Sequence, residues 1–447
     1  MKGDFSRDTF DARRDYVRVL MQQGRVQVDA DFNEQHAISH YMTRSLARDL
    51  IGPHGGPAGC LGFDCLTDGR TFLRWRSLCQ DVRATEKASA DEDIDWTRDF
   101  LITPGRYYVD GMRLENQTIV RFSDCADRSA VDALAGADRS FVVYLEAFER
   151  VITAAEDPNL LDPALDGMDT SVRLQVQWHV TLQPCDVGIS ARELPLRSRV
   201  CYGLMTARTN PASSGSLGGY TGMENHLYRI EIHAGGETDT PSFKWSRDNG
   251  AAVRSVRQPV PAPTGNQLTL DLLPAIGVRS RQVPTDVGAF VELLPEFDPG
   301  PYVQGPLLRV VAVSSDLNSL KLDTDGAVVD TKRVRLLRCW GQPSSAIPVP
   351  GDKTPVALES GLEIIFDTAT RSYLRAGDYW TIPARPSTRD IEWPRSGGTS
   401  KDAGRPLAKP PNGPRSASAP LGLLRKTDGQ AGWTFIDARR RFGPLAI

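Results

Sequence analysis

Several features that commonly carry function are scarce or absent in this chain of 447 residues. Lysine is rare, since only nine of the 53 Lys and Arg residues are lysine, and 56 Asp and Glu residues offset these cations. The formal net charge is −3, and no local block of Lys or Arg interrupts this balance. Because phosphate binding requires a basic surface, we expect no nucleic-acid binding.

Long apolar runs are also absent. Residues 1–8 are polar, no apolar signal-peptide core follows them, and no stretch approaches the roughly 18 apolar residues of a membrane span. We therefore expect assembly in the cytoplasm and no direct insertion into a membrane. The seven cysteines are scattered without a C-x-x-C pair, which predicts reduced thiols rather than a zinc site.

The usual catalytic motifs are missing as well. The sequence contains no G-x-S-x-G, no H-E-x-x-H, no P-loop and no G-x-G-x-x-G between a strand and a helix. We therefore predict no enzymatic activity, no cofactor and no metal site. The least implausible polar site consists of Arg229, Glu231 and His233, which share one face of a predicted strand. A satisfied polar network is the favoured interpretation there, and a ligand-binding or acid–base site is the alternative.

One amphipathic helix is predicted near the N-terminus. Asp29 or Asp31 can cap it, with Glu34 as the returning half of a capping box, and Gly52-Pro53 ends it. Its apolar residues recur four positions apart and predict one buried face, packed on a sheet or on a partner subunit: Ile38, Met42, Leu46 and Leu50.

The rest of the sequence is typical of β structure. Short alternating runs bounded by turns predict strands within 105–114, 141–150, 173–180, 226–233 and 243–250, and several more between 268 and 337. The pairs Asp110-Gly111 and Asn249-Gly250 are strong hairpin signals. The predicted fold is mainly β (α+β), with several β-sandwich or barrel-like domains, an N-terminal arm and one amphipathic helix.

These patterns divide the chain into six predicted parts. They are an N-terminal arm and helix (1–55), a β-rich central region (56–260), a small β-barrel or sandwich (261–345), a β segment joining the core (346–385), a Pro/Gly/Ser-rich loop (386–420) and a C-terminal docking segment (421–447). Residues 1–35 are too polar to form a core alone, so we expect this arm to dock on a neighbouring subunit. The predicted contact residues are Phe5, Arg7, Phe10, Arg13 and Arg14.

Several motifs, in a fixed order along the chain, resemble one family. They lie at 1–11, 19–35, 104–111, 224–233, 243–250 and 377–380. The chain is similar to an uncharacterised family encoded in gene clusters for extracellular contractile injection systems, which are phage-tail-like particles. It departs from the family's pattern at 415–421, where a His-containing stretch is expected.

The resemblance implies a structural subunit without enzymatic activity, associated with the baseplate as a cage or collar around the spike. The implied partners are other subunits of the particle, namely baseplate or spike proteins and further copies of this chain. The particle would then be released or remain associated with the envelope.

Two alternatives remain open for the sequence. A fibre-like component of the same particle would bind a receptor or glycan through exposed aromatics. The aromatics at Tyr107-Tyr108, Trp245 and Tyr379-Trp380 are candidates for such a surface, but aromatics at strand spacing are more often part of a core, and this is the favoured interpretation. A polysaccharide-active enzyme, the weaker alternative, would use Glu231 and His233.

Overall fold

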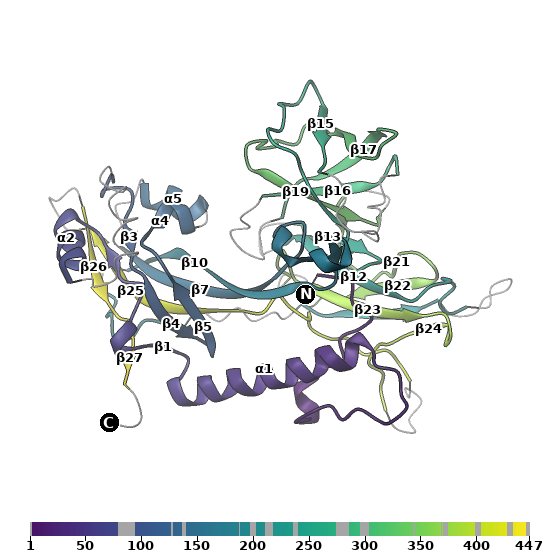
Figure 1. Cartoon of the computed structure of the whole chain (residues 1–447), viewed down its shortest axis with the longest axis horizontal. Helices are drawn as coiled ribbons and strands as arrows, with labels where there is room; N and C mark the ends of the chain where they lie inside the picture. Colours follow the sequence, from purple (N-terminus) through teal and green to yellow (C-terminus); the bar gives the residue numbers. More distant parts are fainter. Residues whose placement is uncertain are drawn as a thin grey trace.

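The computed structural model describes residues 2–78, 94–126, 128–135, 140–186, 188–196, 203–210, 218–235, 240–273, 286–295, 304–342, 345–367, 369, 374–397, 404–426 and 432–443. The fold is mainly β, as predicted. Figure 1 shows a first lobe at the left, a central sandwich at the right and a barrel above the sandwich. One long helix, α1 (Asp29–Ile51), runs beneath the first lobe and the sandwich.

Among the described residues, three sheets and three helices form the first lobe. Its core contains buried aromatic and aliphatic side chains, including Phe63, Tyr107 and Val143. The first sheet has the order β27 (Arg441–Phe442), β1 (His54–Pro57), β4 (Gly105–Val109) and β5 (Met112–Asn116). The second sheet has the order β10 (Arg173–Cys185), β7 (Ser140–Ile152), β25 (Ser416–Lys426) and β26 (Trp433–Asp437). The third sheet has the order β2 (Cys65–Leu66), β3 (Leu101–Ile102) and β6 (Val120–Arg121). The helices are α2 (Gly69–Leu78), α4 (Phe122–Cys125) and α5 (Arg128–Ala135).

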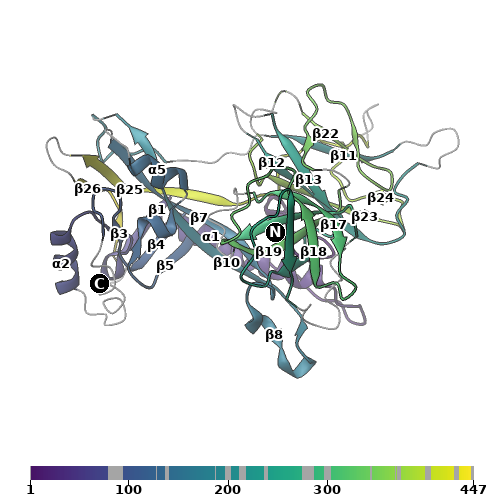
Figure 2. The same cartoon turned by 90° about the horizontal axis from the view of Figure 1, so that it is seen from above.

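The short elements lie between these strands. A two-stranded ribbon, β8 (Leu161–Asp162) and β9 (Met168–Asp169), projects from the connection between β7 and β10, as Figure 2 shows from above. The 3-10 turns are at Ala12–Arg14, Ala58–Cys60, Pro158–Leu160 and Pro163–Leu165.

The central sandwich packs two sheets around a second core. Alternation along its middle strand, β12, directs Tyr228, Ile230 and Ile232 into this core, as predicted. The larger sheet has the order β20 (Ile347–Pro348), β13 (Ser242–Ser246), β12 (His226–Ala234), β23 (Tyr379–Arg385) and β24 (Asp390–Ile391); the smaller has β11 (Met205–Thr209), β22 (Leu362–Phe366) and β21 (Val356–Ala357).

A six-stranded sheet forms the barrel and encloses a third core. Its two edge strands meet, because Val256 and Leu272 form a bridge flanked by backbone hydrogen bonds from Arg257 N to Asp271 O and from Leu273 N to Ser255 O. These contacts close the sheet on itself. The order is β14 (Val253–Ser255), β19 (Val334–Trp340), β16 (Phe290–Pro295), β17 (Leu307–Val313), β18 (Ser319–Asp323) and β15 (Gln267–Asp271).

The three units are nested along the chain rather than consecutive. The barrel is inserted between β13 and β20 of the sandwich, and the sandwich in turn is inserted between β10 and β25 of the first lobe. The predicted region 56–260 therefore contributes to all three cores, and the barrel begins at β14, before residue 261. The predicted docking segment 421–447 pairs with β7 and β1 of its own chain.

The predicted helix forms, but most of its apolar stripe is exposed to solvent and is not packed on a sheet. Ile38 is buried, whereas Met42, Leu46 and Leu50 are 51%, 60% and 62% exposed. Polar contacts rather than an apolar stripe fix α1 to the first lobe, through Arg44 and Arg48. The apolar face is therefore not packed on a sheet of its own chain, and packing on a partner subunit stays a prediction.

The predicted capping box does not form either. The N-cap of α1 is Val28, which makes no side-chain cap. Asp29 instead accepts hydrogen bonds from the backbone and hydroxyl of Ser6, and Glu34 accepts one from the hydroxyl of Thr9. The acidic first turn of the helix thus holds the N-terminal arm.

Two further predictions need correction. At Asn249-Gly250 both residues have positive φ, as the turn signal requires, but β13 pairs with β12 and β20, so the turn carries the chain from the sandwich into the barrel and forms no hairpin. The segment predicted as a loop over 386–420 includes β24 and the start of β25, and its Trp393 is buried in the sandwich core.

Candidate functional site

A group of buried charges lies on the face of β12 that points away from the sandwich core. Arg229 and Glu231 alternate with the core residues of this strand. In the register of the sheet, Glu231 stands between Lys244 of β13 and Tyr379 of β23. Residues that are opposite one another on adjacent strands have side chains within reach, so the register of the sheet brings these charges together.

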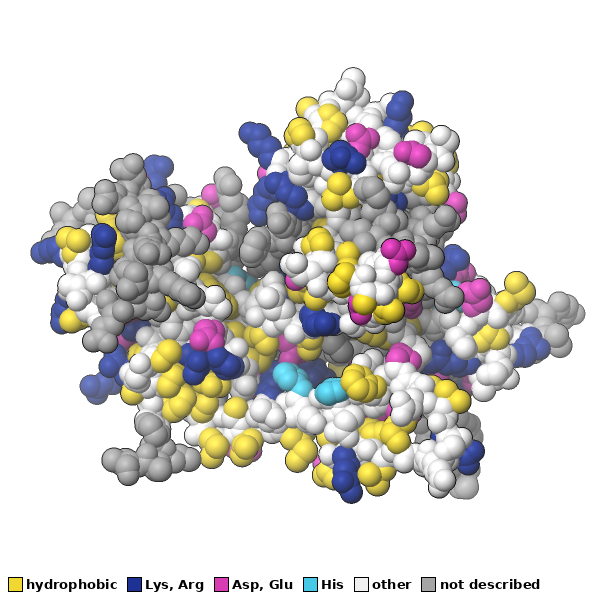
Figure 3. Space-filling model, in the orientation of Figure 1, with side chains coloured by type: hydrophobic (Ala, Val, Ile, Leu, Met, Phe, Trp, Pro, Cys, Tyr) yellow, Lys and Arg dark blue, Asp and Glu magenta, His cyan; other side chains and the backbone are white. Residues whose placement is uncertain are grey.

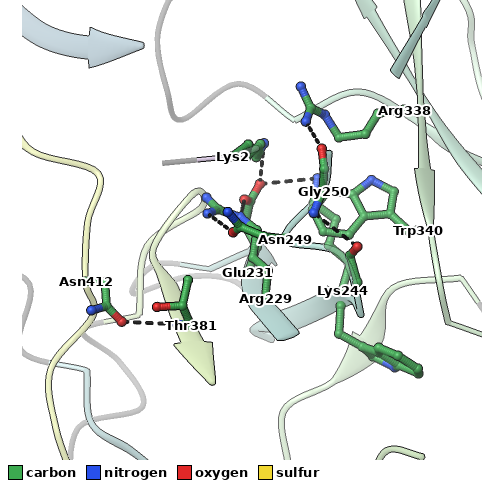
Figure 4. Close-up of polar contacts among 12 residues, drawn as sticks. Lys2, Arg229, Glu231, Lys244, Asn249, Gly250, Arg338, Trp340, Thr381 and Asn412 are labelled. Carbon is green, nitrogen blue, oxygen red and sulfur yellow. Dashed lines mark hydrogen bonds and ion pairs between the residues drawn. The ribbon is translucent and has the colours of Figure 1, made fainter. Parts of the chain in front are cut away.

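The charges form one connected set, drawn in Figure 4. Nε of Arg229 lies 2.6 Å from Oε2 of Glu231, and Nζ of Lys2 lies 3.0 Å from Oε1 of Glu231. Nζ of Lys244 lies 3.6 Å from the same Oε1 and 2.6 Å from Oε1 of Glu292 on β16. The set therefore joins the N-terminal arm, the sandwich and the barrel. We call Lys2, Arg229, Glu231, Lys244 and Glu292 the ion cluster.

Aromatic rings and neutral donors complete the surroundings of these charges. Trp340 donates its indole N–H to Oε2 of Glu292 at 2.9 Å, and Nζ of Lys244 lies 4.5 Å from the centre of the same ring. The guanidinium of Arg229 stacks 3.6 Å above the ring of Tyr379. Gly305 N–H donates to Glu292 at 2.9 Å. Such contacts stabilise charges that burial has removed from water.

The backbone of Gly3 also holds the arm beside the cluster, through two hydrogen bonds with Asn249. Asn249 donates from its side-chain amide to the carbonyl of Gly3 at 3.0 Å, and its own carbonyl accepts the Gly3 N–H at 3.3 Å. The buried turn that leads from the sandwich to the barrel is therefore also the binding site of the arm.

Electrostatics keep both carboxylates of the cluster ionised. Burial alone would raise the pKa of Glu231, but the nearby charges of Lys2, Arg229 and Lys244 outweigh it and hold that pKa well below its ordinary value. For Glu292, burial is likewise outweighed by Lys244 and Lys2, and its pKa is lowered. A carboxylate with so low a pKa is a weak base, and the arrangement serves best to hold charges in fixed positions.

The predicted site is only partly assembled. Arg229 and Glu231 are paired as predicted, whereas no hydrogen bond of the described residues reaches Nδ1 of His233. Burial, together with the charge of Lys244, lowers the pKa of His233 to about 4, so its imidazole is neutral at pH 7.

Sequence reasoning missed the remaining members of the cluster. Glu292 interrupts the apolar run of β16, and Lys244 stands between the core residues Phe243 and Trp245. A lone charge in each of two apolar strands is a signal for a buried pair, because such charges are rarely buried without a partner. No comparable signal marks Lys2.

The residues predicted for the arm divide into two groups. Phe5, Arg7 and Phe10 lie against their own chain: Arg7 is 3.7 Å from Glu392, and the Phe10 ring is 5.6 Å from that of Tyr41. Arg13 and Arg14 are exposed.

Beside the ion cluster is a cavity of about 590 Å³. The arm and α1 form one wall, β7 and β10 of the first lobe another, and β12, β16, β19 and β23 the rest. The cavity is thus the place where all parts of the molecule meet. Cavities of this size are typical of sites for small molecules.

The predicted aromatic candidates do not form an exposed surface. Tyr107, Trp245 and Trp380 are buried in the cores, Tyr379 is covered by Arg229, and Tyr108 is half-buried. Within the residues that the structure describes, no group of three or more His, Cys, Asp or Glu is placed to hold a metal ion. None of the described helices is long and apolar enough to cross a membrane.

About half of the exposed large apolar residues that the structure describes lie on α1 and on the arm. Figure 3 shows yellow side chains along the lower edge of the molecule, where α1 runs. We call the exposed side chains of Phe32, Met42, Leu46 and Leu50 the outer face of α1. The arm adds further exposed apolar residues before the helix: Tyr16, Val17, Leu20, Met21 and Val26.

Comparisons with known proteins give one match. A family model, described as a family of unknown function (DUF6519), matches residues 1–194 and 197–423. No curated protein and no solved structure matches the chain. Since the family model covers most of the sequence, the chain belongs to this family of unknown function, DUF6519.

Proposed function

We propose that this chain is a structural, non-enzymatic subunit of a contractile injection particle, associated with its baseplate as part of a cage or collar around the spike. The proposal combines the resemblance in the sequence with one structural observation, the outer face of α1. Monomeric proteins rarely leave contiguous large apolar side chains in water, and such surfaces commonly mark interfaces.

The occupant that we propose for this surface is a second copy of the chain. α1 has 23 residues and is about 34 Å long. Met42, Leu46 and Leu50 recur along it four residues apart, and such a ridge can pack into the groove of another helix. An interface that uses the same surface on both copies is the commonest solution in homo-oligomers. Such a contact alone closes a dimer, so a ring or cage would use a second interface in addition to the outer face of α1.

Light scattering across a concentration series of the purified chain tests self-association. We expect the mass to exceed that of a monomer, and we expect the double substitution Leu46→Glu/Leu50→Glu to reduce it to a monomer. Leu73 and Leu78 of α2 are exposed to a similar degree, 61% and 72%, so Leu73→Glu/Leu78→Glu is the matched control. A wild-type chain that remains monomeric at every concentration would contradict self-association as the mechanism.

A genetic experiment tests the place in a particle. In a bacterium whose gene cluster encodes both the chain and the particle, deletion of its gene should abolish complete baseplates in electron micrographs. Removal of residues 2–28 alone should have the same effect if the arm is needed for assembly. Intact particles that no longer attach to target cells would instead support the receptor-binding alternative.

A further inference from the structure

The cavity beside the ion cluster has an unusual balance of charge. Four carboxylates line it: Asp8, Glu149, Glu231 and Glu292. Six Lys and Arg residues line it as well: Lys2, Arg7, Arg150, Arg229, Arg338 and Arg415. Because fewer carboxylates than cations line the cavity, its interior attracts anions.

Most of the lining cations have a carboxylate partner. Lys2 and Arg229 pair with Glu231, as described above, and Arg7 pairs with Glu392. Arg150 pairs with Glu156, and Glu149 is already engaged by Arg44 and His40 of α1. The carboxylates in these ion pairs already bind a cation, so they do not neutralise the remaining cations of the cavity.

Arg338 of β19 and Arg415 have no carboxylate partner among the described residues, and of these two only Arg338 is buried. In the described part of the chain, the one hydrogen bond of Arg338 runs from Nη1 to the carbonyl of Gly250. Nε is buried and finds no partner among the described residues. A guanidinium cannot shed its proton in a protein, so Arg338 keeps a full positive charge beside the cavity. Burial lowers its pKa, although the charges of Glu292 and Glu231 oppose this shift.

The remaining donor of this guanidinium determines which kind of ligand it can bind. Nη1 is bound to Gly250 and Nε is enclosed by protein atoms, so Nη2 is the donor that remains for an oxygen of a carboxylate or phosphate group. Lys2 adds a second cation close by: burial lowers its pKa to about 8, the charge of Glu231 opposes this, and the charge of Arg338 adds to the lowering. An oxyanion between them would relieve the repulsion between the two cations.

We propose that the cavity binds a small molecule carrying a carboxylate or phosphate group, with Arg338 and Lys2 as its principal cationic contacts. The site is independent of the outer face of α1, so it stands whether or not the chain self-associates. Because the arm and α1 form one wall, a bound oxyanion would also fasten the arm to the barrel.

Isothermal titration calorimetry on the full chain at pH 7 tests the site. The two probes are inorganic phosphate and citrate, each titrated against a chloride buffer of the same ionic strength. Arg338→Met removes the guanidinium and keeps an unbranched side chain. Arg257→Met is the matched control, because Arg257 is exposed on the same barrel and does not line the cavity.

We expect saturable binding of at least one probe, with affinity at least tenfold weaker in Arg338→Met and within twofold of wild type in Arg257→Met. Phosphate binding without citrate binding would assign the site to phosphate esters, and the reverse to polycarboxylates. Should Arg338→Met fail to fold, Lys2→Met takes its place, with the same weakening expected. Absence of binding by both probes, or binding unaffected by the Arg338 and Lys2 substitutions, would overturn the proposal.

Discussion

Arg44 of α1 donates from Nη2 to Oδ2 of Asp110 at 2.8 Å, and from Nε to the carbonyl of the same residue at 2.9 Å. Asp110 is in the turn between β4 and β5, so one side chain holds the long helix against the tip of a hairpin in the first lobe. Gly111 follows in this turn, where a Cβ would be only 2.2 Å from the carbonyl oxygen of Arg44. The helix and the hairpin therefore fit each other at backbone level.

Loss of this contact should loosen α1. We expect Arg44→Met to lower the free energy of unfolding by about 1–3 kcal/mol, because it removes the half-buried guanidinium that both Asp110 and Glu149 contact. Arg48 pairs with the same Asp110 but is 62% exposed, so Arg48→Met should cost less than about 1 kcal/mol. Urea unfolding measures both values, and equal costs would show that Arg44 is not the anchor.

Substitutions of different members of the ion cluster should lower the free energy of unfolding by different amounts. Glu231→Gln leaves Lys2, Arg229 and Lys244 without their shared carboxylate, and we expect a loss of about 3–5 kcal/mol in the free energy of unfolding. Lys2→Met should cost clearly less, since Glu231 keeps two other cations. Urea unfolding of the two variants gives the comparison, and a larger loss for Lys2→Met would mean that the arm, rather than the carboxylate, organises the cluster.

Two neighbouring residues on one side of α1 should differ in their contribution to stability, because Ile38 is buried and Met42, one turn further along, is exposed. Ile38 is 1% exposed, so Ile38→Ala should cost about 2–5 kcal/mol in the free energy of unfolding. Met42 is 51% exposed, and Met42→Ala should change that free energy by less than about 0.5 kcal/mol at concentrations where the chain is monomeric. A large cost for Met42→Ala under these conditions would show that the outer face is covered within a single chain.

Mild acid should weaken the fold through His54, which is buried, and His233, which is half-buried. Burial lowers the pKa of His54 to about 4, assisted by the charge of Arg440, and burial lowers that of His233 to about 4 as well. The ordinary value is 6.5, so between pH 6.5 and 4 the unfolded chain binds protons that the folded chain does not. Stability should therefore fall as the pH drops through this window, with a slope of at most about 1.4 kcal/mol per pH unit for each histidine.

Chemical unfolding at several pH values checks this dependence. His54→Gln should flatten the curve between pH 6.5 and 4. His36→Gln, a change on the exposed surface of α1, is the control and should leave the curve as it is. An unchanged slope in the His54 variant would remove His54 as a source of the acid sensitivity.

Local patterns in the sequence predicted individual elements well. Gly52-Pro53 marked the end of α1, Asp110-Gly111 marked a hairpin, and alternation along β12 separated Tyr228 from Glu231. These features depend on neighbouring residues only, through backbone preferences and the periods of helix and strand.

Features that depend on distant partners were predicted poorly. Leu46 and Leu50 repeat with helical period, yet period alone does not say whether an apolar face meets its own chain or another. Lys2 reaches Glu231 only because the sandwich, the barrel and the arm converge at one point. Asn249-Gly250 forms a turn, but the strands before and after this turn do not pair with each other. β13 pairs with β12 and β20 instead of β14.

The nested order of the three units has a consequence for how the chain must fold. β7 receives β10 on one side and β25 on the other, and β25 follows the whole of the sandwich and barrel in the sequence. During synthesis the ribosome therefore releases β7 long before the strand that covers its second edge. The barrel and sandwich can complete themselves first, while an open strand edge, a known template for aggregation, waits in the first lobe. A chain truncated before residue 416 would keep that edge permanently open.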